Sequence, residues 1–132
     1  MKHLNKQAKK IMDRLTEGLN GGHRKIDNGG KSIMAVHVEQ VNQTPLGPVF
    51  SVTHFYEQNG DLMHDPDMTF LRGITGDYFP LSFQQDNLGI YQEVVAEWKE
   101  DGRIKSYRPR LSADLTSFAN TWMRNIKEQQ KL

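Results

Sequence analysis

The C-terminal segment, LSADLTSFANTWMRNIKEQQKL, places the strongest constraint on the fold of this chain. Its apolar side chains recur every three or four residues, which is the spacing of one face of an α-helix. The hydroxyl of Ser112 is expected to cap the first turn, and Asp114 suits the positive end of the helix dipole. Because an apolar stripe is stable only when buried, the segment predicts a helix that packs on another element. The stripe consists of Leu115, Phe118, Ala119, Trp122, Met123 and Ile126.

A second amphipathic helix is predicted over residues 3–19, at the other end of the chain. Lysine and arginine side chains occupy the side opposite its apolar stripe. Gly18 and Gly21-Gly22 permit the left-handed conformations that end a helix, and residues 27–30 predict a loop before the next element. The apolar stripe comprises Leu4, Ala8, Ile11, Met12, Leu15 and Leu19.

Between the two helices, runs of β-forming residues alternate with turn residues, which predicts an antiparallel meander. Asn59-Gly60 suits a two-residue type I′ hairpin, because both central positions of that turn require a positive φ. With two amphipathic helices and one sheet, we expect a single α+β domain over residues 1–132. Both helices are expected to pack on one face of a sheet of about five or six strands, with the other face partly in water. The predicted strands are 33–42, 49–58, 61–63 continuing through 68–72, 77–84, 90–98 and 103–108.

Composition excludes several classes of protein. A chain of 132 residues, of which 36% are hydrophobic and 25% charged, is long enough to bury one core and is typical of globular proteins. It has no cysteine, which excludes disulfides, thiolate catalysis and cysteine-ligated metal sites. The first residues lack the apolar core of a signal peptide, and no run approaches the length of a membrane span. We therefore expect a cytoplasmic protein with no membrane partner.

Residues 55–70, FYEQNGDLMHDPDMTF, concentrate acidic side chains around one histidine. An EF-hand would need alternating acidic or amide ligands, a glycine at the sixth position and a glutamate at the twelfth, and no register of this segment supplies them. Pro66 cannot donate a ladder hydrogen bond, so Asp65-Pro66-Asp67 is expected to interrupt the returning strand. We interpret the acids as turn and bulge residues, with a weak cation site as the alternative. The histidine is His64, and the four carboxylates are those of Glu57, Asp61, Asp65 and Asp67.

Two histidines, His37 and His54, lie on the first two predicted strands. The connection over residues 43–48 would place His37 and His54 directly opposite each other on the first two predicted strands. A shared metal ion is one interpretation, but a one-residue change of register removes the pairing, and the spacing nominates no third ligand. Packing or solvent-facing roles are the other interpretation. We expect no metal and no cofactor.

One enzymatic pattern is present in a loose form. Pro66-Asp67 followed by Glu97-Trp98-Lys99 matches PD…ExK, in which two carboxylates hold a divalent cation and a lysine positions water for phosphodiester hydrolysis. A predicted strand, 77–84, separates the two halves. The chain lacks a glycine-rich phosphate loop, a GxSxG elbow and an HExxH helix. We expect no catalytic residues, and a metal-dependent nuclease stays as an alternative.

Charge is divided along the chain, because both ends are basic and the middle is acidic. The basic ends are candidates for phosphate contacts in a nucleic-acid-binding protein, through Lys6, Lys10, Arg14, Arg108 and Arg110. The acidic middle offers a surface to a basic partner protein instead. Its candidate side chains are Glu39, Glu57, Asp61, Asp77, Asp86, Glu93 and Glu97.

The stretch QQDNLGIYQE is rich in amides, which both donate and accept hydrogen bonds. Such a cluster can recognise a polar ligand or a peptide backbone, and if it does, we expect the site between this turn and two tyrosines. Capping of loose strand ends is the alternative role. The candidate site consists of Tyr56, Gln84, Gln85, Asp86 and Tyr91.

Three stretches, HFYEQNGDLMHDPDMTF, YFPLSFQQDNLGIYQEVV and SFANTWMRNIKEQQ, carry a further signal. Together they resemble a family of small bacterial proteins of unknown function, found largely in conjugative and other mobile elements. The resemblance covers about Ile33 to Gln130 and implies an accessory protein without assigned catalytic residues. The sequence as a whole therefore favours a non-enzymatic interaction protein with an unknown protein partner, with nucleic-acid binding as the alternative.

Overall fold

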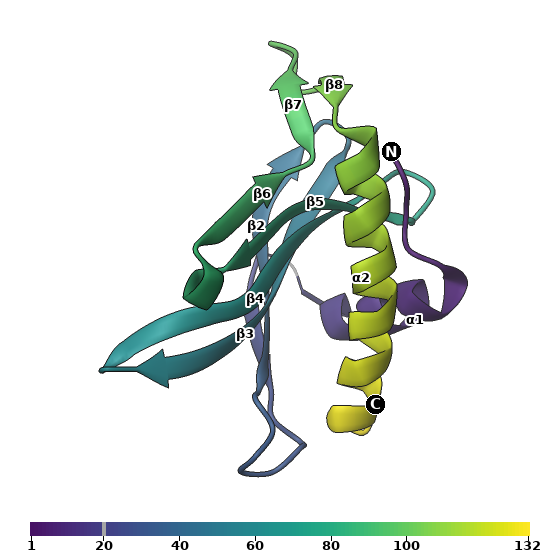
Figure 1. Cartoon of the computed structure of the whole chain (residues 1–132). Helices are drawn as coiled ribbons and strands as arrows, with labels where there is room; N and C mark the ends of the chain where they lie inside the picture. The colour runs from purple at the N-terminus through teal and green to yellow at the C-terminus, as the bar shows by residue number, and fades with distance from the viewer. Residues whose placement is uncertain (20) are drawn as a thin grey trace.

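The computed structural model describes residues 1–19 and 21–132. Within these residues, Figure 1 shows a helix at each end of the chain and the strands between them. The helices are α1 (Lys6–Thr16) and α2 (Pro109–Gln129), and a short 3₁₀ turn, η1 (Asp86–Leu88), follows the fifth strand. The strands are β1 (His23–Ile26), β2 (Val36–Thr44), β3 (Gly47–Gln58), β4 (Asp61–Arg72), β5 (Tyr78–Gln85), β6 (Ile90–Glu93), β7 (Val95–Trp98) and β8 (Ile104–Tyr107).

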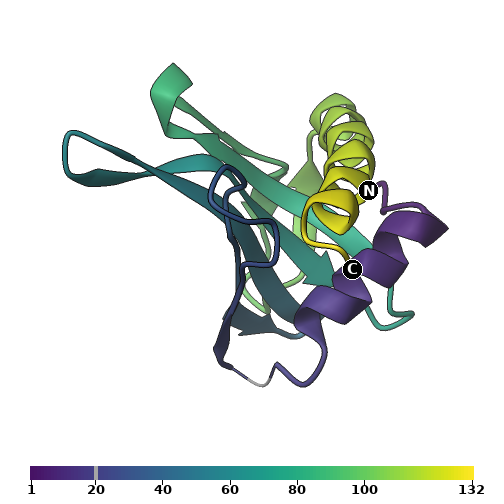
Figure 2. The same ribbon diagram turned by 90° about the horizontal axis from the view of Figure 1, so that it is seen from below.

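Strands β1 to β6 form one antiparallel sheet in chain order, and β7 pairs with β8 in a separate two-stranded sheet. Both helices lie on the same side of the six-stranded sheet (Figure 2). The predicted α+β fold, with an antiparallel meander and terminal helices on one face, is confirmed. We call the face that the helices leave uncovered the open face.

The helices bury the predicted stripes with two local differences. Helix α1 begins at Lys6, because the Asn5 side chain accepts a 2.9 Å hydrogen bond from the backbone N–H of Ala8. Helix α2 begins at Pro109, whose fixed φ suits a first helical position. The prediction that Ser112 caps α2 is wrong: Ser112 lies inside the helix, and its Oγ accepts a hydrogen bond from the Lys2 backbone N–H. Phe118 is 41% exposed, although the rest of its stripe is buried.

The main core lies between the sheet and the two helices. The phenol of Tyr78 is buried within it, donates a 2.7 Å hydrogen bond to Asp13 and lies 3.2 Å from the hydroxyl of Thr16. Burial raises the pKa of Tyr78. These contacts fix β5 against α1. The sheet contributes Val36, Val38, Phe50, Val52, Met68, Phe70, Tyr78 and Phe83 to this core.

A second, smaller core lies on the open face. The hairpin of β7 and β8 folds over one end of that face and buries Val49, Leu71, Leu81 and Val95. The side chain of Val94 belongs to the main core and that of Val95 to the second, as the alternation of an extended chain allows, and the chain leaves the six-stranded sheet after Glu93. The single predicted strand 90–98 is therefore two strands, β6 and β7, in different sheets.

Other strand predictions are partly confirmed. Asn59 and Gly60 have φ values of 54° and 84°, as a type I′ turn requires. Strand β4 continues through Asp65-Pro66-Asp67, contrary to the predicted interruption, because a register shift between Thr53 and Phe55 of β3 accommodates the extra residue. Strand β1 was not predicted.

The predicted pairing of His37 with His54 is wrong. His37 lies opposite Thr53, and His54 lies opposite Val36, so the two imidazoles project from opposite faces of the sheet. The ring of His54 packs edge-on against Trp122, with ring centroids 5.4 Å apart, and the residue is only 5% exposed. Its Nε2 is buried and has no hydrogen-bond partner in the part of the chain that the structure describes. Burial lowers the pKa of His54.

We expect His54→Phe to be more stable than the wild type by about 1 kcal/mol near neutral pH, because phenylalanine keeps the ring contact without an unpaired buried nitrogen. We also expect a smaller dependence of stability on pH. The unfolded chain protonates His54 at its ordinary pKa, above that of the folded state, so the wild type loses free energy of unfolding as the pH falls below about 6.5. Urea unfolding at several pH values measures both effects. Val52→Ala, in the same core and without a titrating side chain, is the control: it should lower the stability but keep the wild-type pH dependence.

Candidate functional site

Two rows of polar side chains cross the open face from β1 to β6. Directly paired residues of neighbouring strands project to the same face of a sheet, so an unbroken series of pairs forms a row. The first row is Lys25, His37, Thr53, Asp67, Gln84 and Tyr91. The second row is His23, Glu39, Ser51, Thr69, Ser82 and Glu93. We call these two series the polar rows.

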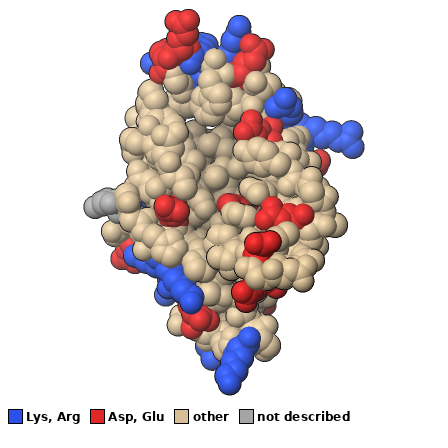
Figure 3. All heavy atoms as spheres, turned by 90° about the vertical axis from the view of Figure 1, so that its left-hand side faces the viewer, with Lys and Arg blue, Asp and Glu red and all other residues tan. Residues whose placement is uncertain are grey.

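The centre of this face is hollow (Figure 3). Small side chains form the floor, because the second row places Ser51, Thr69 and Ser82 on the three middle strands. One hollow of about 370 Å³ extends from Thr69 to Glu39 and the histidines of β1 and β2. A smaller hollow of about 180 Å³ shares Thr69 and extends toward β6 and β7. We call the two hollows together the open-face cleft.

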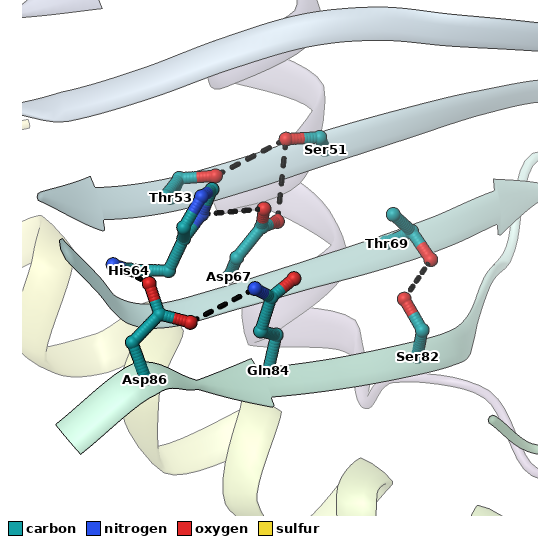
Figure 4. A network of polar contacts seen from close by, with 8 residues as sticks. All are labelled: Ser51, Thr53, His64, Asp67, Thr69, Ser82, Gln84 and Asp86. Atoms are coloured by element: carbon teal, nitrogen blue, oxygen red, sulfur yellow. Dashed lines mark hydrogen bonds and ion pairs between the residues drawn. The ribbon is translucent and has the colours of Figure 1, made fainter. Parts of the chain in front are cut away.

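Hydrogen bonds between side chains hold the floor of the cleft in place (Figure 4). His64 Nδ1 lies 3.0 Å from one oxygen of Asp67, and the Ser51 hydroxyl donates to the other oxygen over 3.4 Å. The Thr69 and Ser82 hydroxyls are 2.5 Å apart. A ligand would therefore meet an ordered set of donors and acceptors.

Asp86 lies at the end of β5, beside the first polar row. One of its oxygens accepts a 2.8 Å hydrogen bond from the backbone N–H of His64, and the other accepts a 2.9 Å bond from the Gln84 amide. The His64 bond first, and then the Gln84 bond, lower the pKa of Asp86. Asp86 is therefore ionised at neutral pH and adds negative charge to this side of the cleft.

Histidines line the opposite side of the cleft. His23 Nε2 and His37 Nδ1 are 3.1 Å apart and share a hydrogen bond, so at least one of the two imidazoles is neutral. Burial first, and then the charge of His23, lower the pKa of His37. The ring of Phe55 stands between two imidazoles, with its centroid 5.1 Å from His37 and 4.9 Å from His64.

The cleft is acidic. Figure 3 shows Asp and Glu side chains on both sides of the hollow, and Lys and Arg side chains mainly toward the edges of the view. Lys25, the lysine of the polar rows, lies 3.9 Å from the carboxylate of Asp27. The cleft and its margin carry four carboxylates, those of Glu39, Asp67, Asp86 and Glu93.

The family model of a domain of unknown function, DUF6908, matches residues 6–132. The chain belongs to this family. No curated protein and no solved structure matches it. The predicted resemblance to a family of unknown function is thus confirmed, and because the DUF6908 description names no activity, the geometry of the cleft carries the functional argument. Among the residues that the structure describes, no helix is both long and apolar enough to cross a membrane.

In this DUF6908 member, the residues predicted as an amide-rich ligand site divide between the two faces. Gln84 and Tyr91 are paired on the open face, and Asp86 bonds to Gln84. Tyr56 follows Phe55 along β3 and therefore points to the other face. Gln85 also points away from the cleft, and its amide donates to Asp65.

The predicted basic residues lie outside the cleft. Lys6, Lys10 and Arg14 recur at four-residue intervals along the exposed side of α1, on the helix-covered side of the sheet. Arg108 and Arg110 lie at the start of α2, and the Arg108 guanidinium donates to the backbone carbonyl of Glu93. Whether these residues contact nucleic acid stays a prediction.

The two halves of the PD…ExK pattern lie in different sheets. Asp67 contacts His64 and Ser51 in the cleft, whereas Glu97 lies on β7 and its carboxylate is 3.6 Å from the ammonium of Lys105. Within residues 1–19 and 21–132, no group of three or more His, Asp or Glu side chains is arranged to hold a metal ion. The geometry therefore gives the nuclease alternative no support.

The hydroxyl floor of the cleft was missed from the sequence. A signal was available, because three strands carry a hydroxyl and a second polar residue at alternate positions: Ser51 with Thr53, Thr69 with Asp67, and Ser82 with Gln84. Alternation of this kind marks a face that is not buried in an apolar core. The sequence does not show, however, that the hydroxyls of Ser51, Thr69 and Ser82 lie side by side, because this depends on the register of the strands.

Proposed function

We propose that the protein is a non-catalytic accessory protein that binds a basic, extended segment of a partner protein in the open-face cleft. The main support is the pair of polar rows, which cross all six strands without a covering helix and carry carboxylates on both sides of a hollow. A face of this kind attracts cationic groups through its electrostatic field and offers hydroxyls for hydrogen bonds.

The chemistry of the cleft favours a basic polypeptide over other ligands. A nucleic-acid backbone would bring phosphates next to Glu39, Asp67 and Glu93, and like charges at close range oppose binding. Catalysis by a serine would need an imidazole beside the hydroxyl as a base. Ser51 instead donates to Asp67, and His64 bonds to the other oxygen of the same carboxylate.

The same proposal includes a cellular setting. The resemblance of residues 33–130 to proteins of conjugative and other mobile elements supports an accessory role in the bacterial cytoplasm. A partner from the DNA-processing or defence machinery of such elements would present the basic segments that this cleft suits.

The test uses fluorescence anisotropy with a short labelled peptide in which arginine alternates with threonine. We expect the peptide to bind at low ionic strength and to bind more weakly as salt is added. The double variant Glu39→Gln with Asp67→Asn should bind about a hundredfold more weakly, because each close charge pair across an interface contributes about 1.5 kcal/mol or more. A peptide with glutamine in place of arginine should not bind.

A matched control removes the same charge from the helix side of the molecule. Glu17 and Glu128 are exposed outside the cleft, and Glu17→Gln with Glu128→Gln should leave peptide binding unchanged. Equal losses in the two double variants would contradict binding in the cleft. Binding of a DNA duplex that is lost on Lys6→Ala, Lys10→Ala and Arg14→Ala, without peptide binding, would instead favour the nucleic-acid alternative.

A further inference from the structure

We propose that the smaller hollow of the open-face cleft binds the guanidinium group of an arginine side chain, held between Tyr91 and Trp98 and against the carboxylate of Glu93. This inference rests on the proposed function, because the arginine would belong to the basic segment of the partner. It goes further by naming the side chain, the place where it binds and the residues that recognise it.

Two exposed aromatic rings form the walls of this hollow. Tyr91 is 60% exposed and Trp98 is 46% exposed, so neither ring is part of a core. They come from different sheets, Tyr91 from β6 and Trp98 from β7, yet both line the same hollow because the β7–β8 hairpin packs on the open face beside β6. Exposed aromatic rings that share a hollow are typical of a binding site.

The carboxylate of Glu93 is oriented and available. The Tyr91 hydroxyl donates a 2.7 Å hydrogen bond to one oxygen of Glu93, and this bond raises the pKa of Tyr91. In the part of the chain that the structure describes, no lysine, arginine or histidine forms an ion pair with Glu93. The Arg108 guanidinium donates to the backbone carbonyl of Glu93. The hollow therefore presents a negative charge without a cationic partner from this region.

The floor supplies acceptors and apolar area. Ser82 lies opposite Glu93 in the second polar row, and its hydroxyl pairs with that of Thr69. Hydroxyl oxygens accept hydrogen bonds through their lone pairs. The side chains of Leu81 and Val95 complete the lining and suit the aliphatic part of an arginine.

These features select arginine among cationic groups. A guanidinium is planar, stacks on aromatic rings and presents five N–H donors in a fixed fork, whereas the lysine ammonium is a strongly hydrated point charge. The volume of about 180 Å³ agrees with this assignment. It is below the roughly 300 Å³ at which pockets for whole small molecules begin, and it suits one side chain.

The test observes the indole N–H signals of uniformly ¹⁵N-labelled protein by NMR. The protein has two tryptophans, and Trp122 is buried in the main core, so it reports on the fold while Trp98 reports on the hollow. Nα-acetyl-arginine methylamide should shift the Trp98 signal in a saturable way. The lysine analogue should shift it less, and the neutral citrulline analogue, which has nearly the same shape as arginine, should not shift it.

Variants identify the residues responsible. Glu93→Gln should weaken arginine binding about tenfold or more, since it removes the negative charge and the charge-assisted hydrogen bonds to the guanidinium while both aromatic rings stay in place. Tyr91→Phe keeps the ring but frees Glu93, and should weaken binding less. Glu97→Gln, on β7 next to Trp98 but outside the lining of the hollow, is the matched control and should bind as the wild type does.

The outcomes separate this inference from the proposed function. If the arginine–threonine peptide binds through Glu39 and Asp67 while the Trp98 signal and Glu93→Gln show no effect, the arginine site is wrong and the proposed function stands. An equal response to arginine and citrulline also overturns the arginine site. If arginine shifts Trp98 and Glu93→Gln abolishes the shift, the site is supported even where the peptide test fails.

Discussion

Replacement of Gly47 by alanine lowers the free energy of unfolding by about 4 kcal/mol. Gly47 begins β3 and has a φ of 141°, a conformation that residues with a side chain rarely adopt. An added Cβ would lie 2.0 Å from the backbone oxygen of Arg72, at the end of β4. The Cβ position is fixed by the main chain of residue 47, and the oxygen belongs to the main chain of Arg72, so neither atom can rotate away. The β3–β4 pairing must therefore open locally to relieve the overlap. Urea unfolding followed by circular dichroism measures the loss.

Gly60 provides the control for this effect. Its φ is also positive, at 84°, but a Cβ at Gly60 would have no atom within 4 Å. We therefore expect Gly60→Ala to lower the free energy of unfolding by about 1 kcal/mol, which is the cost of a positive φ for alanine. Similar losses for the two variants would show that the Arg72 contact contributes nothing.

Replacement of Gln130 by alanine lowers the free energy of unfolding by about 3 kcal/mol. Gln130 follows α2 and is 0% exposed. Its amide oxygen accepts a 2.7 Å hydrogen bond from the Asn28 backbone N–H, and its amide nitrogen donates over 3.0 Å to the backbone carbonyl of Met34. The side chain therefore holds the loop between β1 and β2 against the end of α2, and alanine removes both bonds and leaves a cavity.

The neighbouring Gln129 is the matched control for Gln130, because its side chain is exposed. Gln129→Ala should change the stability by less than about 0.5 kcal/mol. Hydrogen exchange gives a second readout: in Gln130→Ala the Asn28 amide should exchange faster, while amides in the middle of β3 keep their order of protection. Unchanged exchange at Asn28 would contradict the role assigned to Gln130.

The helices and the side of the sheet that they cover were predictable because burial of an apolar stripe is a requirement that the sequence itself expresses. The apolar stripe that ends at Ile126 needs a large apolar surface as its partner, and in this chain only the predicted sheet offers one. The structure confirms that the stripe packs on the sheet. The turn at Asn59-Gly60 was predictable for a similar reason. A type I′ turn requires positive φ at both central positions, and asparagine followed by glycine is the pair that adopts these values most readily. Strand β1 was missed, since its four residues are only partly buried and depend on pairing with β2.

The candidate site was less predictable because it depends on register. Three register shifts, near Gln40, His54 and Thr69, decide which residues of β2 to β5 share a face. The predicted pairing of His37 with His54 was wrong because of the shift near Gln40. The hydroxyl floor was missed because its residues are brought together by the same kind of shift. Shifts of this kind are set by the packing of the whole sheet, and a local stretch of sequence does not specify them.

The placement of Val94 and Val95 in different cores links the β7–β8 hairpin to the stability of the whole fold. Val94 is anchored under the helices, while the next residue seats the hairpin that carries Trp98. The β7–β8 hairpin, which carries Trp98, therefore cannot move as an independent lid without removing Val94 from the main core. A ligand that binds against Trp98 would raise the melting temperature of the whole protein. Its dissociation would need no hinge motion.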